Sequence, residues 1–146
     1  MRKINSIVVH CSATREGCTL TSEALEAEHR RRGFRTTGYH YYIRRDGTVL
    51  GTRSLELPGA HCRGHNKYSI GICYEGGLDA RGNPKDTRTP EQRSALHLLV
   101  YQLLQQFRNA RVCGHRDLSP DLDGDGKVEP REWVKQCPCF EVSKEF

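Results

Sequence analysis

Residues 4–10, Ile-Asn-Ser-Ile-Val-Val-His, set the fold expected for this chain. Their short apolar run is typical of a buried strand. A second run, Ser69–Tyr74 (SIGICY), has the same character, and Arg111–Cys113 is a shorter candidate further along the chain. These runs predict separate strands of one sheet.

Two helices are predicted by their end signals. The first spans Thr21–Arg32, with Thr21 as its N-cap. The second spans Pro90–Phe107, where Thr89 and Gln92 form a capping box and proline occupies the first helical position. One face of the second helix is apolar and carries Leu96, Leu99, Val100, Leu103, Leu104 and Phe107.

A hairpin and a loop complete the expected elements. Tyr39–Arg45 and Thr48–Arg53 flank Asp46-Gly47, a pair typical of tight hairpin turns. The segment Gly76–Arg88 is rich in turn residues and predicts a loop. The alternation of strands and helices therefore predicts an α/β fold, a single domain over residues 1–146 with a central mixed β-sheet flanked by helices.

The composition narrows the class of protein without identifying it. Hydrophobic residues make up 36% of the 146 and fall in periodic runs, which favours a globular chain. No apolar run is long enough for a transmembrane segment. The net charge of +5 suits a polyanionic partner, either nucleic acid or an acidic cell-wall polymer. No aromatic-rich basic motif of a nucleic-acid module is present, so we expect no nucleic-acid partner.

The N-terminus and the cysteines bear on the compartment. Met1–Val9 lacks a separate apolar signal segment, so we expect cytoplasmic synthesis without a signal peptide. Seven cysteines is an odd number that cannot pair fully within the chain. In a reducing compartment most of them would be free thiols or metal ligands.

Three residues at the ends of predicted elements are candidate metal ligands. His10 ends the first strand, His115 follows the last strand candidate, and Cys137 lies further on. Two imidazoles and one thiolate leave one tetrahedral position of a zinc ion open, as in catalytic sites. The spacing alone leaves open that the three are unrelated, partly buried residues. Cys139 is an alternative third ligand.

Several short motifs follow one another along the chain, and both their residues and their order are informative. They are Val8–Thr14, Gly38–Tyr41, Asp46-Gly47, Ala60-His61 with Asn66, Ser69–Ile72, Gly114–Asp117 and Lys135–Pro138. Together they resemble the zinc-dependent N-acetylmuramoyl-L-alanine amidases of the type-2 family, which includes small phage lysozyme-type endolysins and the animal peptidoglycan recognition proteins. The resemblance extends from about Ile4 to Phe140.

The resemblance implies an activity and a set of roles. His10, His115 and Cys137 would bind zinc in a surface groove, and Tyr39 and Lys135 would assist catalysis. The reaction implied is hydrolysis of the amide bond between N-acetylmuramic acid and L-alanine in peptidoglycan. Tyr39 would donate a hydrogen bond or relay a proton near the attacking water, and Lys135 would stabilise the oxyanion. A cysteine followed by proline is the family order, which favours Cys137 over Cys139.

The resemblance also suggests how substrate is held and where the protein acts. His61 matches the family pattern and would bind substrate, although a loop histidine can also be a plain surface residue. Arg63 and Asn66 lie in the same loop and would line the groove with it, where Arg63 could receive carboxylates of the stem peptide. We expect a monomer that acts on the cell wall after release. The alternative is a non-catalytic peptidoglycan recognition module. Non-catalytic relatives lose the cysteine ligand, whereas this chain has Cys137.

The segment Asp121–Glu132 matches the twelve-residue calcium loop D-x-[DN]-x-[DN]-G-x₅-E. The ligands expected from this pattern are Asp121, Asp123, Asp125, the Lys127 carbonyl and Glu132. No helix obviously precedes the loop, so it is not a complete helix–loop–helix motif. An acidic, solvated loop without an ion is the alternative interpretation.

Overall fold

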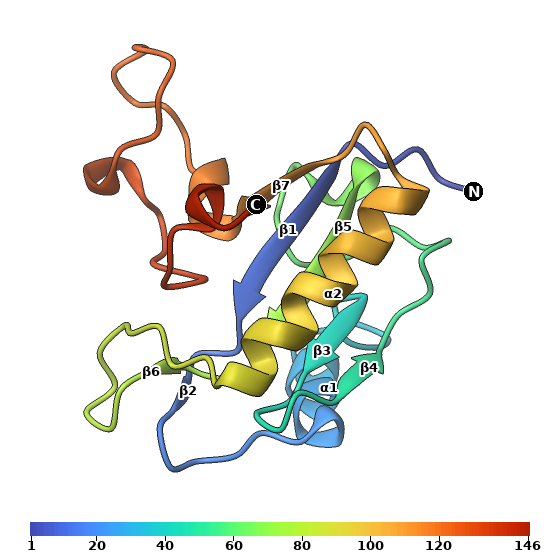
Figure 1. The fold of residues 1–146 in the computed structure, drawn as a ribbon, viewed down its shortest axis with the longest axis vertical. Helices are drawn as coiled ribbons and strands as arrows, with labels where there is room; N and C mark the ends of the chain where they lie inside the picture. The colour runs from blue at the N-terminus through green and yellow to red at the C-terminus, as the bar shows by residue number, and fades with distance from the viewer.

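A five-stranded sheet forms the centre of the computed structural model, which describes all 146 residues (Figure 1). Its strand order is β4-β3-β5-β1-β7. The strands are β1 (Ser6–Cys11), β3 (Tyr41–Ile43), β4 (Val49–Gly51), β5 (Ser69–Tyr74) and β7 (Arg111–Gly114). Only the β3–β4 pair is antiparallel, so the predicted mixed sheet is confirmed.

The central strands β1 and β5 are almost completely buried. Successive side chains of a strand point to opposite faces of the sheet. Ile7 and Val9 accordingly pack in the main core. Val8 and His10 belong to the other face, which also carries Cys73 of β5. The candidate ligand His10 therefore lies on the face opposite the main core.

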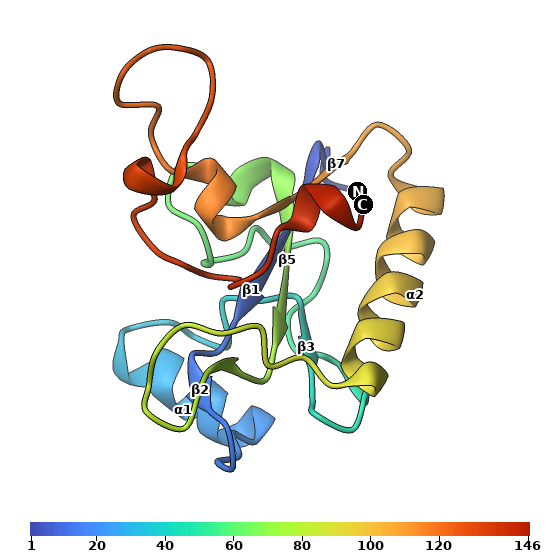
Figure 2. The same cartoon turned by 60° about the vertical axis from the view of Figure 1, so that its left-hand side comes forward.

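Helix α2 (Pro90–Gln106) covers the main-core face of the sheet (Figure 2). Its predicted capping box is present, since Thr89 accepts from the backbone of Gln92 and Gln92 accepts from the backbone of Thr89. The amide of Gln92 also donates to the backbone carbonyls of Ile43 and Glu75. The apolar stripe packs on the sheet through Leu96, Leu99, Val100 and Leu103.

Helix α1 (Ser22–Arg31) lies on the other side of the sheet (Figure 2). Thr21 caps it as predicted, by accepting from the backbone N–H of Ala24 at 3.1 Å. Its inner face contributes Leu25 to a small cluster with Tyr42 and Cys73. This cluster is much smaller than the core under α2, and His10 lies on the same side of the sheet.

Two local expectations are corrected by the structure. The predicted loop Gly76–Arg88 contains the strand β6 (Gly77–Leu78), which pairs in parallel with β2 (Thr14–Arg15). A two-residue pairing depends on backbone hydrogen bonds and leaves no periodic signal in the sequence. The hairpin around Asp46-Gly47 is present, but its strands are shorter than predicted. Tyr39 precedes β3, and Thr52 follows β4. The backbone N–H of Thr52 donates to the carbonyl of His40 at 2.9 Å.

The chain beyond β7 has no strand and no α-helix. It contains three short 3₁₀ helices: η2 (His115–Leu118), η3 (Pro130–Glu132) and η4 (Val142–Lys144). Another 3₁₀ helix, η1 (Asn66–Tyr68), precedes β5. The C-terminal segment is fastened to the main core by Phe140 and Val142, and the loop between η2 and η3 projects outward (Figure 1). No helix of the structure has the length and apolar character needed to cross a membrane.

The carboxylate of Glu75 links three parts of the chain at the end of β5. It is 1% exposed. It accepts from the backbone of Leu20 at 2.7 Å, and from the backbone of Arg45 and the guanidinium of Arg44, both at 2.9 Å. Burial by itself would raise the pKa of Glu75, but these donors outweigh it and hold the pKa below its ordinary value. The segment before α1 and the end of β3 are thereby held against β5.

We expect Glu75→Gln to lower the free energy of unfolding at pH 7 by about 1–3 kcal/mol, because an amide group replaces an acceptor of buried donors. The pKa of Glu75 is lower in the folded than in the unfolded protein, so its carboxylate contributes fully to the free energy of unfolding above the unfolded pKa of ~4.3. This stabilisation is lost as the pH falls through the pKa of Glu75 in the folded protein. Urea unfolding of both proteins at pH 7 and at about pH 3 measures the difference.

Glu16→Gln is the matched control, since Glu16 pairs with Lys85 at the surface. An exposed pair contributes at most about 1 kcal/mol. Equal losses in the two variants, or a Glu75→Gln effect that does not shrink at low pH, would contradict this account.

Candidate metal centre and groove

The three predicted metal ligands converge in the folded chain. His10 lies near the end of β1, and His115 directly follows β7. Because β1 and β7 are parallel neighbours, with Val9 opposite Gly114, the two imidazoles come from the same end of the sheet. Their ring centroids are 4.6 Å apart. One ligand atom each from His10, His115 and Cys137 lie within 4.8 Å of one another.

The segment that carries Cys137 is held against the sheet by its own backbone. The sulfur of Cys137 accepts from the backbone N–H of Cys11 at 3.1 Å. The backbone N–H of Arg116 donates to the carbonyl of Cys137 at 2.8 Å. One residue further, the carbonyl of Pro138 accepts from the hydroxyl of Tyr74 at 2.6 Å. These bonds place the thiol beside the end of β1.

The alternative ligand Cys139 lies elsewhere. Its sulfur is 4.0 Å from that of Cys11, and it is not grouped with the two histidines. Its contact with Cys11, together with burial, raises the pKa of the Cys139 thiol, so this thiol stays protonated. The geometry therefore groups Cys137, and not Cys139, with His10 and His115.

The donor set fits a zinc ion. Two imidazole nitrogens and one sulfur are ligands that zinc prefers, and three protein ligands leave a fourth position open. A histidine must be neutral to bind a metal. Burial first, and then the neighbouring His61, His115 and Lys135, hold the pKa of His10 well below its ordinary value. His10 is therefore a neutral imidazole with a lone pair available.

Tyr39 and Lys135 both border this cluster. The ring centroid of Tyr39 lies 5.0 Å from that of His10. Burial, followed by the nearby Cys73 and Cys137, raises the pKa of Tyr39 well above its ordinary value, so its hydroxyl keeps its proton. Lys135 is exposed and forms no salt bridge. One neutral donor and one free cation thus stand beside the three ligands.

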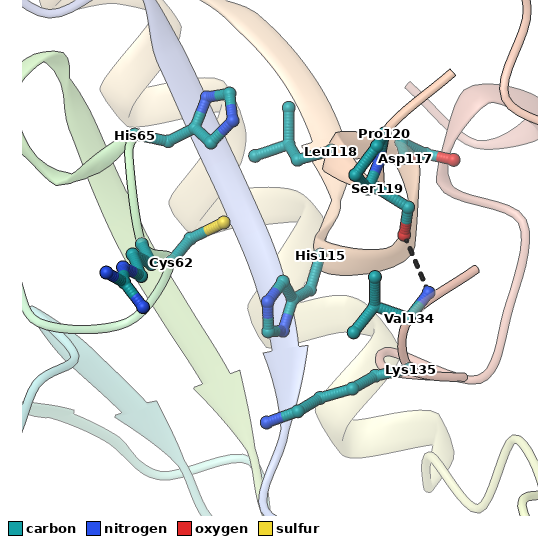
Figure 3. Close-up of a pocket in the computed structure, with 10 residues that line it drawn as sticks. Cys62, His65, His115, Asp117, Leu118, Ser119, Pro120, Val134 and Lys135 are labelled. Atoms are coloured by element: carbon teal, nitrogen blue, oxygen red, sulfur yellow. Dashed lines mark hydrogen bonds between the residues drawn. The ribbon is translucent and has the colours of Figure 1, made fainter. Parts of the chain in front are cut away.

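Two hollows adjoin the cluster and share His115 and Lys135. The larger has a volume of about 670 Å³ and lies between the segment 62–65 and the segments 115–120 and 134–135. Figure 3 shows the side chains of His115 and Lys135 extending from one wall toward the wall that carries Cys62 and His65. The smaller hollow, of about 260 Å³, leads from the cluster to Tyr39 and α1.

The three predicted substrate-binding residues have different surroundings. Arg63 is exposed and lines the larger hollow. The side-chain oxygen of Asn66 accepts from the backbone N–H groups of His61 and Cys62, both at 2.9 Å, so this amide shapes the loop. His61 is buried and bonds to His10. Burial first, and then nearby positive groups, lower the pKa of His61 to about 3. Of the three, Arg63 lines the larger hollow and His61 borders the smaller one.

Helix α1 contributes to the groove, which the sequence did not predict. Glu28, His29 and Arg32 line the smaller hollow. The ring of His29 lies 5.4 Å from that of Tyr39, and its Nδ1 accepts from the backbone of Gly38 at 2.7 Å. His29 follows Leu25 by one helical turn, which places it on the inner face of the helix. That spacing predicts a buried position but not a cavity next to it.

The acidic loop brings several of its carboxylates together. Oxygens of Asp121, Asp123 and Glu132 lie within 4.8 Å of one another, and Asp125 groups with Asp123 and Glu129. Asp121 and Glu132 also accept backbone N–H groups of the loop. The backbone of Lys127 donates to Asp125. Local hydrogen bonds thus hold the loop in this structure, and the calcium site stays a prediction.

Comparison with known proteins places this geometry in context. Residues 1–138 match the N-acetylmuramoyl-L-alanine amidase family. The endolysin of Klebsiella phage KP32 is 35% identical over 143 residues, which cover 98% of this chain and 85% of the phage protein. A peptidoglycan-recognition protein of Drosophila melanogaster is 29% identical over 120 residues, or 79% of this chain and 65% of the fly protein.

A solved structure agrees with these sequence matches. The N-acetylmuramoyl-L-alanine amidase LysC of Clostridium intestinale URNW superposes with a TM-score of 0.76 at 26% identity. The superposition covers 99% of this chain and 82% of LysC. The family match includes every strand, both α-helices and all three residues of the metal cluster.

Proposed function

This chain belongs to the N-acetylmuramoyl-L-alanine amidase family of type 2, and we propose that its reaction takes place at a zinc ion held by His10, His115 and Cys137. The protein is a peptidoglycan amidase, which hydrolyses the amide bond between N-acetylmuramic acid and L-alanine. The observation that supports the zinc assignment is the convergence of two imidazoles and one thiol. The complete ligand set favours catalysis over recognition without cleavage.

The two hollows beside the metal cluster support this substrate. The scissile amide joins a sugar acid to a peptide, so substrate must extend in two directions from the reacting carbonyl. Hollows adjoin the cluster on two sides, and His115 and Lys135 border both. A zinc ion held there supplies Lewis-acid polarisation of the amide carbonyl and lowers the pKa of water at the site to ~7.

Tyr39 and Lys135 have complementary parts in this proposal. The protonated hydroxyl of Tyr39 donates a hydrogen bond or relays a proton near the attacking water. The ammonium group of Lys135 stabilises the negative charge that develops on the carbonyl oxygen. Lys135 is suited to this because it is exposed and forms no salt bridge with a carboxylate of the protein. Both groups act on the reaction and neither belongs to the ligand set.

The remaining parts of the proposal concern binding and assembly. Arg63, exposed in the larger hollow, receives carboxylates of the stem peptide. Residues 1–146 work as one amidase domain on the cell wall. A monomer is sufficient, because one chain contributes every ligand and both catalytic residues.

We expect the purified protein to hold one zinc ion, and His10→Ala, His115→Ala or Cys137→Ser to abolish hydrolysis and weaken zinc retention. Each substitution removes one of only three protein ligands. Elemental analysis after dialysis, together with release of stem peptide from peptidoglycan, measures both effects.

Cys139→Ser is the matched control for Cys137→Ser. It removes a thiol two residues away that the structure does not group with the histidines. We expect it to keep zinc and activity. Full activity in Cys137→Ser, or loss of zinc in Cys139→Ser, would show that the third ligand is wrongly assigned.

We expect Tyr39→Phe and Lys135→Ala to retain zinc and to lose turnover. Loss of an oxyanion donor typically costs about 10²–10³ in turnover, and we expect an effect of that order for Lys135→Ala. Lys144→Ala, which removes an exposed cation on η4, is the control and should behave as the wild type. Normal turnover in either catalytic-site variant would refute the role given to that residue.

The calcium loop remains part of the proposal, supported by its sequence pattern and by the grouping of Asp121, Asp123 and Glu132. Glu132 is close in sequence to Lys135 and Cys137, so a cation there would order the segment leading to the metal centre. We expect the melting temperature of the zinc-loaded protein to rise with calcium concentration. Calorimetric titration checks binding, and Glu132→Gln is expected to remove it. Absence of both heat and a thermal shift at millimolar calcium would leave the loop as an ordinary acidic turn.

A further inference from the structure

A chain of hydrogen bonds leads away from the metal cluster into the protein. Nε2 of His10 lies 2.9 Å from Nδ1 of His61. Nε2 of His61 lies 3.0 Å from the hydroxyl oxygen of Ser69. His10 and Ser69 are 1% and 0% exposed, and His61 is 9% exposed. His61 is therefore hydrogen-bonded to a metal ligand, and it also borders the smaller hollow.

The ring of His61 occupies a slot that two glycines leave free. A Cβ atom at Gly71 would lie 2.6 Å from two carbons of the imidazole, and one at Gly59 would lie 2.4 Å from Cδ2. Contacts below 3.0 Å are not tolerated, so any other residue at either position would displace the ring. Asn66 fixes the backbone of His61 as well. The position and the plane of the imidazole are both determined.

Metal binding by His10 would fix the direction of these hydrogen bonds. One nitrogen cannot bind a metal and form the hydrogen bond to His61, so Nδ1 is the nitrogen left for the metal. A neutral imidazole that binds through Nδ1 carries its proton on Nε2. Nδ1 of His61 must then accept that proton's hydrogen bond, and Nε2 of His61 must donate to Ser69.

We propose that His61 is a positioning residue of the metal centre, which accepts from Nε2–H of His10, donates to Ser69, and so holds His10 with Nδ1 turned to the metal. Histidine ligands of metals are oriented by such partners on their second nitrogen. This role is distinct from the substrate contact expected for His61 from the sequence, which stays a prediction. It rests on the proposed zinc assignment.

The experiment compares zinc affinity among variants of the whole protein by competition with a chelator. His61→Leu removes the acceptor, and we expect affinity to fall by about 10–100-fold, the usual cost of losing such a partner. His61→Asn keeps an oxygen close to the position of Nδ1, and we expect it to restore most of the affinity. The visible absorption of the cobalt-substituted protein should change in His61→Leu and return toward the wild type in His61→Asn.

Ser69→Ala provides a second test that preserves the buried ring. It removes the acceptor that keeps the proton of His61 on Nε2, so we expect a smaller loss of zinc affinity in the same direction. If His61→Leu does not fold, the zinc affinities of Ser69→Ala and His61→Asn test the positioning role of His61.

His40→Asn is the matched control. His40 is also buried, with its ring centroid 6.1 Å from that of His61. Its nitrogens bond to the backbone of Gly71 and Leu57 and to Arg2, not to a metal ligand. We expect this variant to lower the melting temperature and to leave zinc affinity unchanged.

The outcomes separate this inference from the zinc assignment. A wild-type protein that holds no zinc overturns both. A wild type that holds zinc, with His61→Leu equal to it in affinity and cobalt spectrum, overturns only the inference. In that case, a raised KM for peptidoglycan in His61→Leu would support the substrate-binding role that the sequence predicts for His61.

Discussion

The parallel pairing of β1 with β5 on one side and β7 on the other underlies both the core and the metal centre. It aligns the carboxyl ends of the strands at one end of the sheet, where His10 and His115 emerge side by side. The same pairing buries β1 on both faces, so its side chains cannot exchange faces without reversing the core. The face on which His10 lies is therefore fixed by the same strand register that fixes the core.

The two faces of the sheet have different roles. Ile7 and Val9 pack under α2 in a large apolar cluster that stabilises the domain. The opposite face carries His10, with the buried ring of His61 next to it and His40 beyond, and its apolar cluster of Leu25, Tyr42 and Cys73 is small. Polar side chains can be buried there because each finds a hydrogen-bond partner. The side chains of β1 that stabilise the core and the one that belongs to the metal cluster thus lie on opposite faces of the strand.

Close packing around glycines joins the irregular segments to this frame. A Cβ atom at Gly114 would lie 2.7 Å from Cδ of Pro138, so the segment that carries Cys137 can approach β7 only because a glycine lies there. Gly59 and Gly71 leave room for His61 in the same way. Burial then keeps His10 and Tyr39 uncharged, while Lys135 stays exposed with its charge unpaired. Differences in solvent exposure therefore leave His10 as a neutral ligand, Tyr39 as a neutral hydrogen-bond donor and Lys135 as an unpaired cation.

Elements with local signals could be predicted from the sequence. Apolar runs and caps predicted both helices and the central strands to within two residues at either end, because hydrogen bonds and burial within each element leave a periodic pattern. Ordered motifs indicated the family and the ligands. Features that depend on contacts between distant segments needed the folded chain. The loop from Ala60 to Asn66 has no periodic pattern, so only the structure shows that His61 bonds to His10 while Arg63 lines the larger hollow. Likewise, the Cys-Pro order favours Cys137 over Cys139, but only the structure shows that the sulfur of Cys137 lies beside His10 and His115 and accepts from the backbone N–H of Cys11, at the far end of the chain.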